Sequence, residues 1–372
     1  MKFSCEKFLL LAAILTSSRA AAAKSPVPAL EGLLIEAEGD SVKISGYDLK
    51  TGISTSVAAE ITEPGSIVLH ARLFCDIVRK LPGDIVTLTS GTGYNVKIDC
   101  EMSEFEILGT PSADYPELPS VDWQNAITIG ERDLKSMISQ TNFAVSDNES
   151  RPIHTGALFE VAGGTLTIVA VDGFRLALRR EKLELEKTPA CSFVVPGSAL
   201  SEVEKIAGDN DRDITITLGS KHIMFTIGDT VLISRRLEGE FLNYKNSIPQ
   251  SNKYLLDTSR RELVDAVERV SLIISDKLKS PVRCVFGSGI VKLFSMSALG
   301  KASDECVISG DGEELEIGFN NKYLLDALKA APADNVRIEL SSGVSPCIIS
   351  PVDDEKNFLY MILPVRLKAY EG

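Results

Sequence analysis

The stretch 165-TLTIVAVDGFRLAL-178 organises the rest of the sequence. Its polar and apolar residues alternate from Thr165 to Ala170, as in a half-buried strand, and Asp172-Gly173 is a strong turn signal. The segment therefore predicts two β-strands with a bend between them. Taken alone, it is also compatible with an ordinary hairpin in a β-rich core, and its importance comes from similar segments elsewhere in the chain.

Three kinds of segment recur along the chain. Strand, glycine turn and second strand begin at Gly32, Gly156 and Val282, which are 124 and 126 residues apart. Segments with a strand, a helix of about ten residues, a polar turn and a strand begin at residues 65, 191 and 315. The predicted helices have apolar residues at helical spacing, namely Leu73, Phe74, Ile77 and Val78 in the first copy and Leu324, Leu325 and Leu328 in the last.

A further helix precedes each unit. The three sequences are KFLLLAAILTSS from residue 7, RDLKSMISQTNFAV from Arg132 and RRELVDAVERVSLII from Arg260. Short predicted strands at 125–129 and 253–256 lead into the second and third helices, and Thr258-Ser259 followed by Glu262 is a capping signal. We therefore expect an α+β protein with a threefold repeat, two helices per domain and domains at 1–122, 123–250 and 251–372.

The N-terminus allows two interpretations. Lysines, an apolar run at residues 8–15 and the small residues that follow resemble a secretory signal peptide. However, Glu6 lies in the supposed basic region, and the run is too short to span a bilayer. Since both sibling repeats have a helix at this position, we expect the run to be the first helix of the first repeat.

Composition narrows the class of protein. The chain has 372 residues, 44% of them hydrophobic and 24% charged, which suits a globular protein of two or three domains. Seven scattered cysteines without a Cys-x-x-Cys pair favour a reduced, cytoplasmic setting and argue against a zinc site or disulfides. The net charge of -13 gives no general sign of nucleic-acid binding, although a local basic face is compatible with it.

Catalytic signals are scarce. The three histidines have no metal-ligand spacing, and the sequence contains neither a phosphate-binding glycine loop nor a nucleophile elbow. We therefore expect no catalytic residue, no metal, no cofactor and no enzymatic activity.

The order of several segments resembles the bacterial sliding clamp, the β subunit of DNA polymerase III. The resemblance spans nearly the whole chain and includes VAVDGFRLAL from Val169, GTPSADYPELP from Gly109, GFNNKYLLDAL from Gly318 and LYMILPVRL from Leu359. It implies a DNA clamp fold in which each domain has two helices packed on antiparallel sheets. It also implies a ring-shaped, head-to-tail homodimer that encircles double-stranded DNA without reading its sequence, and a processivity factor for the polymerase.

The resemblance also implies sites for DNA and for ring closure. Phosphate contacts that position without specifying are expected from five residues, Lys24, Arg72, Arg79, Asn148 and Arg151. Ring closure is expected to use Phe105, Ile273 and Ile274. For the charged residues the alternative is a solvated surface, and for the isoleucines it is an ordinary core.

The third implied site is a cleft between domains 2 and 3. There, short peptides of the polymerase α subunit, other polymerases, the clamp loader and repair proteins would insert aliphatic and aromatic side chains. The cleft residues implied by the resemblance are Val171, Gly173, Phe174, Arg175, Leu176, Leu242, Asn320, Tyr323, Val344, Met361, Leu363, Pro364, Val365, Arg366 and Leu367.

This chain departs from the usual family pattern at several positions. Phe174 replaces a frequent His, Leu242 a common Pro, and His154 a usual aliphatic residue; Gly197-Ser198 stand where basic residues are frequent; and residues 368–372 extend beyond Leu367. The competing functions are a secreted or periplasmic binding protein, supported by the N-terminus alone, and a clamp paralogue that acts as an interaction scaffold.

Overall fold

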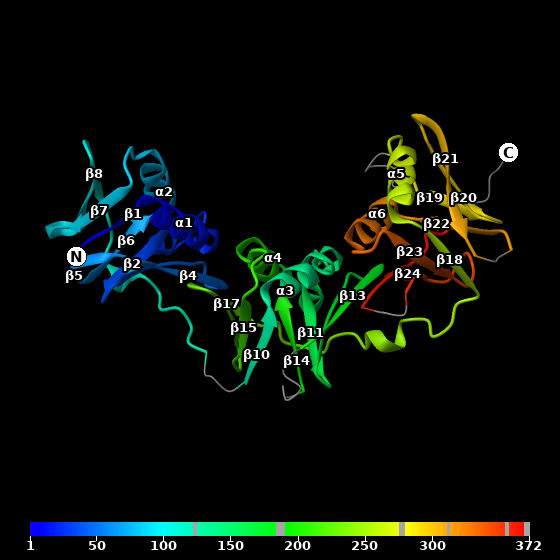
Figure 1. The fold of residues 1–372 in the computed structure, drawn as a ribbon, viewed down its shortest axis with the longest axis horizontal. Coiled ribbons are helices and arrows are strands. Elements are labelled where there is room, and N and C mark those ends of the chain that lie inside the picture. The colour runs from blue at the N-terminus through cyan, green and yellow to red at the C-terminus, as the bar shows by residue number, and fades with distance from the viewer. Residues whose placement is uncertain (122–124, 184–189, 275–279, 311–312, 354–356, 368–372) are drawn as a thin grey trace. The chain divides into compact units, whose positions relative to one another are not determined.

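The computed structural model describes residues 1–121, 125–183, 190–274, 280–310, 313–353 and 357–367 (Figure 1). It contains two compact units: unit 1 comprises Met1–Leu134 and Ser201–Arg236, and unit 2 comprises Lys135–Leu200 and Leu237–Gly372. The division passes through α3 (Glu131–Ser139) and α4 (Gly197–Ile206) of the middle repeat. The domain boundaries expected from the sequence therefore stay a prediction.

Unit 1 contains a five-stranded and an eight-stranded antiparallel sheet. The first has the order β5-β1-β7-β8-β9, and the second has the order β10-β15-β16-β17-β4-β3-β2-β6. The strands are β1 (Lys2–Glu6), β2 (Gly32–Glu38), β3 (Ser41–Tyr47), β4 (Thr51–Ala58), β5 (Glu60–Glu63), β6 (Gly65–His70), β7 (Ile85–Ser90), β8 (Asn95–Cys100), β9 (Ser103–Leu108), β10 (Asn125–Gly130), β15 (Asp213–Leu218), β16 (His222–Ile227) and β17 (Thr230–Arg235).

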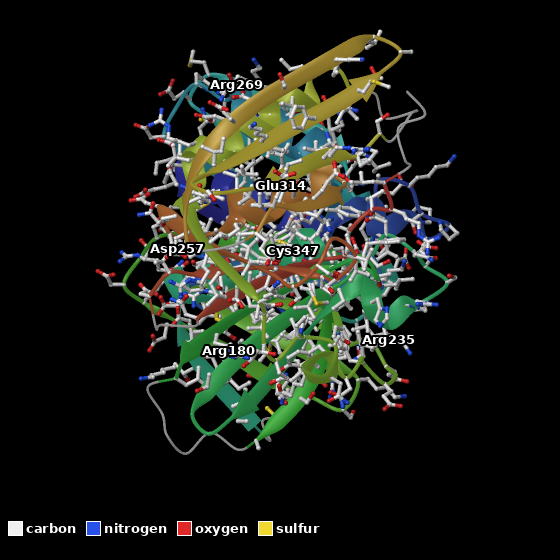
Figure 2. All side chains as sticks on the ribbon, turned by 90° about the vertical axis from the view of Figure 1, so that its right-hand side faces the viewer. Arg180, Arg235, Asp257, Arg269, Glu314 and Cys347 are labelled. Atoms are coloured by element: carbon white, nitrogen blue, oxygen red, sulfur yellow. The ribbon has the colours of Figure 1, made fainter. Side chains whose placement is uncertain are left out.

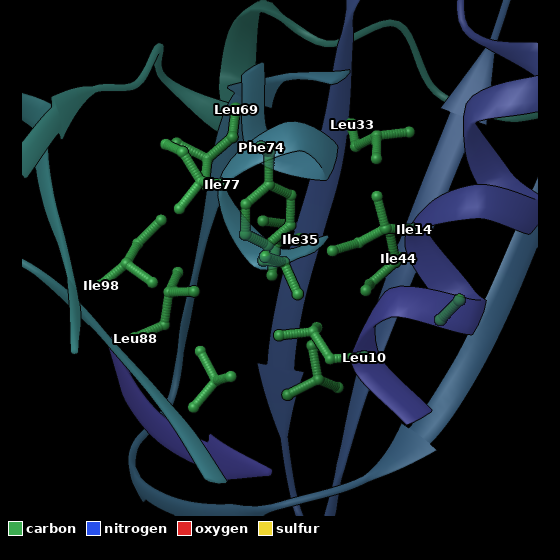
Figure 3. Packing of buried hydrophobic residues seen from close by; sticks show 14 of the residues in the cluster. Leu10, Ile14, Leu33, Ile35, Ile44, Leu69, Phe74, Ile77, Leu88 and Ile98 are labelled. Carbon is green, nitrogen blue, oxygen red and sulfur yellow. The ribbon is translucent and has the colours of Figure 1, made fainter. Parts of the chain in front are cut away.

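The helices α1 (Lys7–Ser17) and α2 (Ala71–Lys80) pack into one core with both sheets of the first repeat (Figure 3). Leu10 and Ile14 of α1 meet Phe74 and Ile77 of α2 there, which confirms that the N-terminal apolar run forms a core helix. Leu73, expected on the apolar face of α2, is instead half exposed. The physical reason is that Phe74, Ile77 and Val78 already fill the stripe that faces the core.

Unit 2 contains one twelve-stranded sheet with the order β14-β11-β12-β13-β25-β24-β23-β18-β21-β20-β19-β22. The strands are β11 (Gly156–Ala162), β12 (Thr165–Val171), β13 (Arg175–Lys182), β14 (Cys191–Pro196), β18 (Tyr254–Ser259), β19 (Val282–Phe286), β20 (Ile290–Ser297), β21 (Gly300–Ser309), β22 (Leu315–Phe319), β23 (Asn335–Leu340), β24 (Cys347–Pro351) and β25 (Phe358–Ile362). The expected hairpin at 165–178 is thus confirmed as β12 and β13.

Two neighbouring helices, α5 (Arg260–Ser271) and α6 (Asn321–Ala330), belong to the last repeat in unit 2. The capping signal before α5 is confirmed, because the Ser259 side chain accepts a hydrogen bond from the Glu262 N–H at 3.4 Å. In the part of the chain that the structure describes, no helix is long and apolar enough to cross a membrane.

Consecutive repeats are joined by edge strands. Each repeat contributes two series of hydrogen-bonded neighbouring strands to the sheets. The first series ends in β9 in the first repeat, β17 in the second and β25 in the third, and the other series ends in β4, β13 and β21. Within unit 1 β17 pairs with β4, from Thr230 opposite Thr55 to Ser234 opposite Thr51. Within unit 2 β25 pairs with β13 over the equivalent positions. These two ladders therefore use the same backbone register at the two joints.

A buried carboxylate stabilises the start of the middle repeat in unit 1. Glu131 is fully buried and accepts hydrogen bonds from the Arg212 guanidinium at 2.6 and 3.0 Å and from the Gly208 N–H at 2.7 Å. The hydrogen bonds from Arg212 lower the pKa of Glu131 below its ordinary value of 4.5, and the hydrogen bond from Gly208 lowers it further. Burial has the opposite effect but does not outweigh them.

Glu131→Gln is expected to lower the free energy of unfolding by about 2 kcal/mol at neutral pH, since charge-assisted hydrogen bonds are lost. A carboxylate with a depressed folded-state pKa stabilises the fold above its unfolded pKa, and this contribution disappears as the pH falls through the folded value. In urea unfolding, the difference between wild type and variant should be constant from pH 7 to 5 and shrink below about pH 4.5. A difference that grows on acidification would contradict this assignment.

Candidate functional site

The turn between β12 and β13 presents Phe174 to solvent. The Asp172 carboxylate accepts hydrogen bonds from the N–H groups of Phe174 and Arg175 at 2.9 and 3.0 Å, and Gly173 has a φ of 93°. A side-chain-bearing residue is strained at that φ, so glycine and the aspartate together fix the turn. Phe174 is 59% exposed, and its carbonyl accepts a hydrogen bond from the Leu363 N–H at 2.8 Å.

Arg175 ties this turn to α6. The side chain is only 9% exposed and donates to Asp172 at 2.8 Å, to Asp326 at 2.6 Å and to the carbonyl of Phe143 at 2.6 Å. Its guanidinium carbon also lies 4.5 Å from the ring centroid of Tyr323. Arg175, expected from the family resemblance to be a cleft residue, thus has an interior position with three acceptors.

Phe174 and Tyr323 form the aromatic part of the site. Their rings stack with centroids 6.2 Å apart and an interplanar angle of 23°. Asn320 fixes the start of α6, because its side chain accepts from the N–H groups of Lys322 and Tyr323. Burial, together with the charge of Asp172, raises the pKa of the Tyr323 hydroxyl, which is therefore neutral at physiological pH.

A cavity of about 500 Å³ opens beside these residues in unit 2. Five of the fifteen expected cleft residues line it, namely Phe174, Arg175, Asn320, Tyr323 and Val365, and the other ten lie outside it. The remaining lining residues are Val145, Ser146, Asp147, Asn148, Asp172, Ile274, Ser280, Asn321 and Lys322. Asn148 and Ile274, expected at the DNA and ring-closure sites, thus share a cavity with expected peptide-binding residues.

An apolar cluster lies beneath the β13–β25 joint. Val171, Leu176 and Met361 are buried in it, with Leu158 and Tyr244 among their neighbours. Expected cleft residues with exposed side chains are Leu242, Val344, Leu363 and Arg366. The His154 ring packs edge-on against Phe241, with the two ring centroids 5.6 Å apart. Burial, followed by the charge of Arg151, lowers the pKa of His154, so its imidazole is neutral at pH 7.

The C-terminal segment at 363–367 lies against β22 of the last repeat. The Val365 N–H donates to the Gly318 carbonyl at 2.8 Å. A Cβ at Gly318 would lie 2.6 Å from the Leu367 side chain, so only glycine allows this approach. Pro364, between the exposed Leu363 and this contact, is half buried.

The expected DNA contacts of unit 1 lie on and near α2. Arg72 and Arg79 are exposed and flank Asp76, with which both form ion pairs, at 4.0 and 2.9 Å. They line a cavity of about 530 Å³ together with residues 21–23, directly before the exposed Lys24. In unit 2, Arg151 is exposed, and the Asn148 side-chain oxygen accepts from the Ser150 N–H at 3.0 Å.

The expected ring-closure residues occupy surface positions within their own units. Phe105 lies on β9 and is partly exposed. Ile273 and Ile274 follow α5 and are half buried, and the Ile273 carbonyl accepts a hydrogen bond from the Ser297 hydroxyl at 2.6 Å.

Sequence reasoning missed several residues at the site. Asp172, which fixes the turn, and Asp326, which binds Arg175, were not singled out for these roles. The Asp-Gly turn signal indicated Asp172, whereas the partnership of Arg175 with Asp326 joins positions 151 residues apart and leaves no local pattern.

Comparisons with known proteins match nearly the whole chain to one protein family. Family models for the N-terminal, central and C-terminal domains of the DNA polymerase III beta subunit match residues 1–119, 128–243 and 245–366. A beta sliding clamp of Staphylococcus epidermidis is 33% identical over 98% of this chain and 99% of its own. The DNA polymerase sliding clamp of Bacillus subtilis superimposes with a TM-score of 0.95 at 32% identity, covering 99% of this chain and all of that one. The beta subunit of Thermotoga maritima gives 0.90 at 29%, with the same coverage.

The repeated fold, matched over all three domains, defines a DNA clamp. The chain belongs to the DNA polymerase III beta subunit family, the beta sliding clamps. It is accordingly a processivity factor that tethers the polymerase to DNA, and not an enzyme.

Arg175→Lys is expected to lower the free energy of unfolding by about 2 kcal/mol, because one ammonium group cannot reach all three acceptors and leaves buried acceptors unsatisfied. Chemical denaturation measures the change. Arg261→Lys, at an exposed position of α5, is the matched control and should be neutral. Equal effects of both substitutions would show that the network around Arg175 does not stabilise the fold.

Proposed function

We propose that two copies of this chain close head to tail into a ring around duplex DNA and present a peptide-binding cleft at the β13–β25 joint. The observation that carries the proposal is the pair of edge strands β9 and β21. Among the described residues, β9 has a neighbour on one side only, β8, and residues 300–306 of β21 pair only with β20. Long open strand edges invite pairing with another chain.

The threefold repeat indicates which strand would pair with each of these two open edges. β9 is the first-repeat equivalent of β17 and β25, and β21 is the third-repeat equivalent of β4 and β13. The pairing β17–β4 joins repeats 1 and 2, and β25–β13 joins repeats 2 and 3. A third joint of the same kind would pair β9 of one copy with β21 of another, and two such contacts close a ring.

The conserved register of the two joints predicts the register of the third. Leu232 lies opposite Ile53 in unit 1, and Ala177 lies opposite Tyr360 in unit 2. The corresponding positions at the third joint are Phe105 and Ala302. Phe105 would then be buried by ring closure, as expected from the family resemblance.

The proposed DNA contacts are Lys24, Arg72, Arg79, Asn148 and Arg151. The exposure of the four charged side chains supports this role, since phosphate contacts need mobile cations and not a fitted pocket. The pairing of Arg72 and Arg79 with Asp76 weakens each contact and suits a ring that slides.

The proposed peptide site combines an apolar floor with an aromatic rim. Burying one large apolar side chain contributes roughly 1.5–3 kcal/mol, so two or three anchors, less the ordering cost, give micromolar binding that exchanges readily. The residues proposed for it are those implied by the family resemblance, namely Val171, Gly173, Phe174, Arg175, Leu176, Leu242, Asn320, Tyr323, Val344, Met361, Leu363, Pro364, Val365, Arg366 and Leu367. Phe174 makes the rim more apolar than a histidine would.

The proposed location is the cytoplasm, and the proposed domains are 1–122, 123–250 and 251–372. Six of the seven cysteines are buried free thiols, as suits a reducing compartment. The ranges matched by the three family models support the domain boundaries.

Ring closure can be tested by cross-linking. Phe105→Cys with Ala302→Cys should form an intermolecular disulfide under mild oxidation, because directly opposed residues of antiparallel strands have Cα atoms about 4.5–5.5 Å apart, within the range of a disulfide. Phe105→Cys with Lys301→Cys is the control, since neighbouring strand residues point to opposite faces. Cross-linking in the control alone, or a wild-type monomer at micromolar concentration in sedimentation, would refute the proposed joint.

Topological binding to DNA distinguishes a ring from a groove binder. The protein is loaded by the clamp loader onto nicked circular DNA, which is then linearised. The wild-type protein should remain on circles and leave linear DNA, whereas the disulfide-closed ring should fail to load. Retention on linear DNA after linearisation would exclude encirclement.

The cleft is tested by truncation. Deleting residues 363–372 should abolish binding of a labelled polymerase-tail peptide in fluorescence anisotropy and leave the dimer intact. Deleting residues 368–372 alone is the control and should preserve the affinity. Unchanged affinity after the longer deletion would contradict the site assignment.

A further inference from the structure

A cluster of cations lies at the β4–β17 joint of unit 1. Lys50 directly precedes β4, and its carbonyl accepts a hydrogen bond from the N–H of Arg235 at 3.1 Å. Arg235 is in turn opposite His222 on the neighbouring strand, so the three residues form a row across adjacent strands. The Arg236 N–H donates to the carbonyl of Lys221 at 2.9 Å. We name Lys50, Lys221, Arg235 and Arg236 the basic corner; Figure 2 labels Arg235.

The positive charge of the basic corner is not neutralised by neighbouring carboxylates. Lys50, Lys221 and Arg235 are exposed, and none of them takes part in an ion pair within the described residues. Burial, followed by the charges of Arg235 and Lys221, lowers the pKa of His222. The Asp48 carboxylate accepts the N–H groups of Lys50 and Thr51 at 2.8 and 2.7 Å, and within the described residues it forms no ion pair with a cation of the basic corner.

Such an arrangement is unfavourable in the free protein. Like charges directly opposite each other on neighbouring strands destabilise a sheet, and Lys50 lies opposite Arg235. The chain as a whole has a net charge of -13, so a local group of cations without ion pairs is opposite in sign to the protein's overall charge. An anionic ligand would remove the repulsion.

The basic corner has the same backbone design as the Phe174 site of unit 2. Asp48 accepts the N–H groups two and three residues later, as Asp172 does. The Lys50 carbonyl accepts from Arg235, as the Phe174 carbonyl accepts from Leu363. The scaffold is therefore used twice, once with an aromatic side chain at its exposed position and once with a cation.

We propose that the basic corner binds the phosphodiester backbone of single-stranded DNA. Lys50, Lys221 and Arg235 are exposed cations at neighbouring positions of three adjacent strands, where the backbone of one flexible strand of DNA can contact all three. Arg236 is half buried and donates to the Gly219 carbonyl at 2.9 Å, so it adds positive charge at the edge of the site. Duplex DNA has a persistence length of about 150 base pairs and therefore runs straight over the dimensions of a protein ring. Single-stranded DNA is flexible enough to bend toward the ends of β4, β16 and β17, where these cations lie. A clamp encircling a primed template has such a strand in its immediate vicinity. Apart from Leu49, the corner offers no exposed large apolar side chain to anchor a peptide.

The test uses the full-length protein and fluorescein-labelled (dT)20 in fluorescence anisotropy between 50 and 200 mM NaCl. Lys50→Gln with Lys221→Gln should weaken binding at least about fivefold at the lowest salt concentration. The slope of log K against log salt should fall by about 1.4, because each phosphate contact of a single strand contributes about 0.7. Both side chains project from exposed turns, and an unchanged thermal midpoint confirms that the variant is folded.

The matched control is Lys182→Gln with Lys292→Gln, which removes the same charge from exposed positions on β13 and β20. Full affinity of this control supports a local site. Equal losses of affinity in both variants would show that binding depends only on the protein's net charge and would overturn the proposal. An unchanged salt slope in the Lys50→Gln, Lys221→Gln variant would overturn it as well. A labelled deca-glutamate peptide that binds as tightly as (dT)20, and loses affinity with the same variant, would instead assign the corner to an acidic peptide and also overturn the proposal.

Discussion

The structure depends on edge-to-edge pairing of strands between repeats. A repeat with two helices and two short rows of strands leaves the backbone N–H and C=O groups of its outer strands without partners, and each such group is costly when buried. The pairs β17–β4 and β25–β13 satisfy them in a common register and turn separate sheets into continuous ones. The joints explain why compact units do not follow the repeats, since strands of two repeats share one sheet in each unit.

The elements of the fold could be predicted from local sequence patterns. The alternation before Asp172-Gly173 predicted β12 and β13, and Ser259 with Glu262 predicted the start of α5. Repetition was decisive for the first helix, because its apolar run is ambiguous in isolation. Leu73 shows the limit of this reasoning: helical spacing indicates which residues can share a face but not how wide the buried stripe is.

The candidate site was predictable only in part. The family resemblance indicated Phe174, Asn320 and Tyr323, and the structure brings them around one cavity. The register of the joints and the contact between Arg175 and Asp326 could not be predicted, because strand pairing and ion pairing over long sequence distances leave no periodic signal. The same limit applies to the basic corner, whose cations come from the ends of three strands.

The turns that precede β4, β13 and β21 each present one exposed side chain on an otherwise fixed backbone. The N–H groups of Lys50, Phe174 and Leu299 donate to Asp48, Asp172 and Ser297 at 2.8, 2.9 and 3.0 Å. The capping side chain and the strand that follows hold the backbone, so the next side chain can change without disturbing the sheet. A cation, an aromatic ring and a leucine that is 75% exposed stand at these three positions. The repeat thus keeps its hydrogen-bonded framework constant at these three turns and changes the chemistry of the exposed surface through one residue in each.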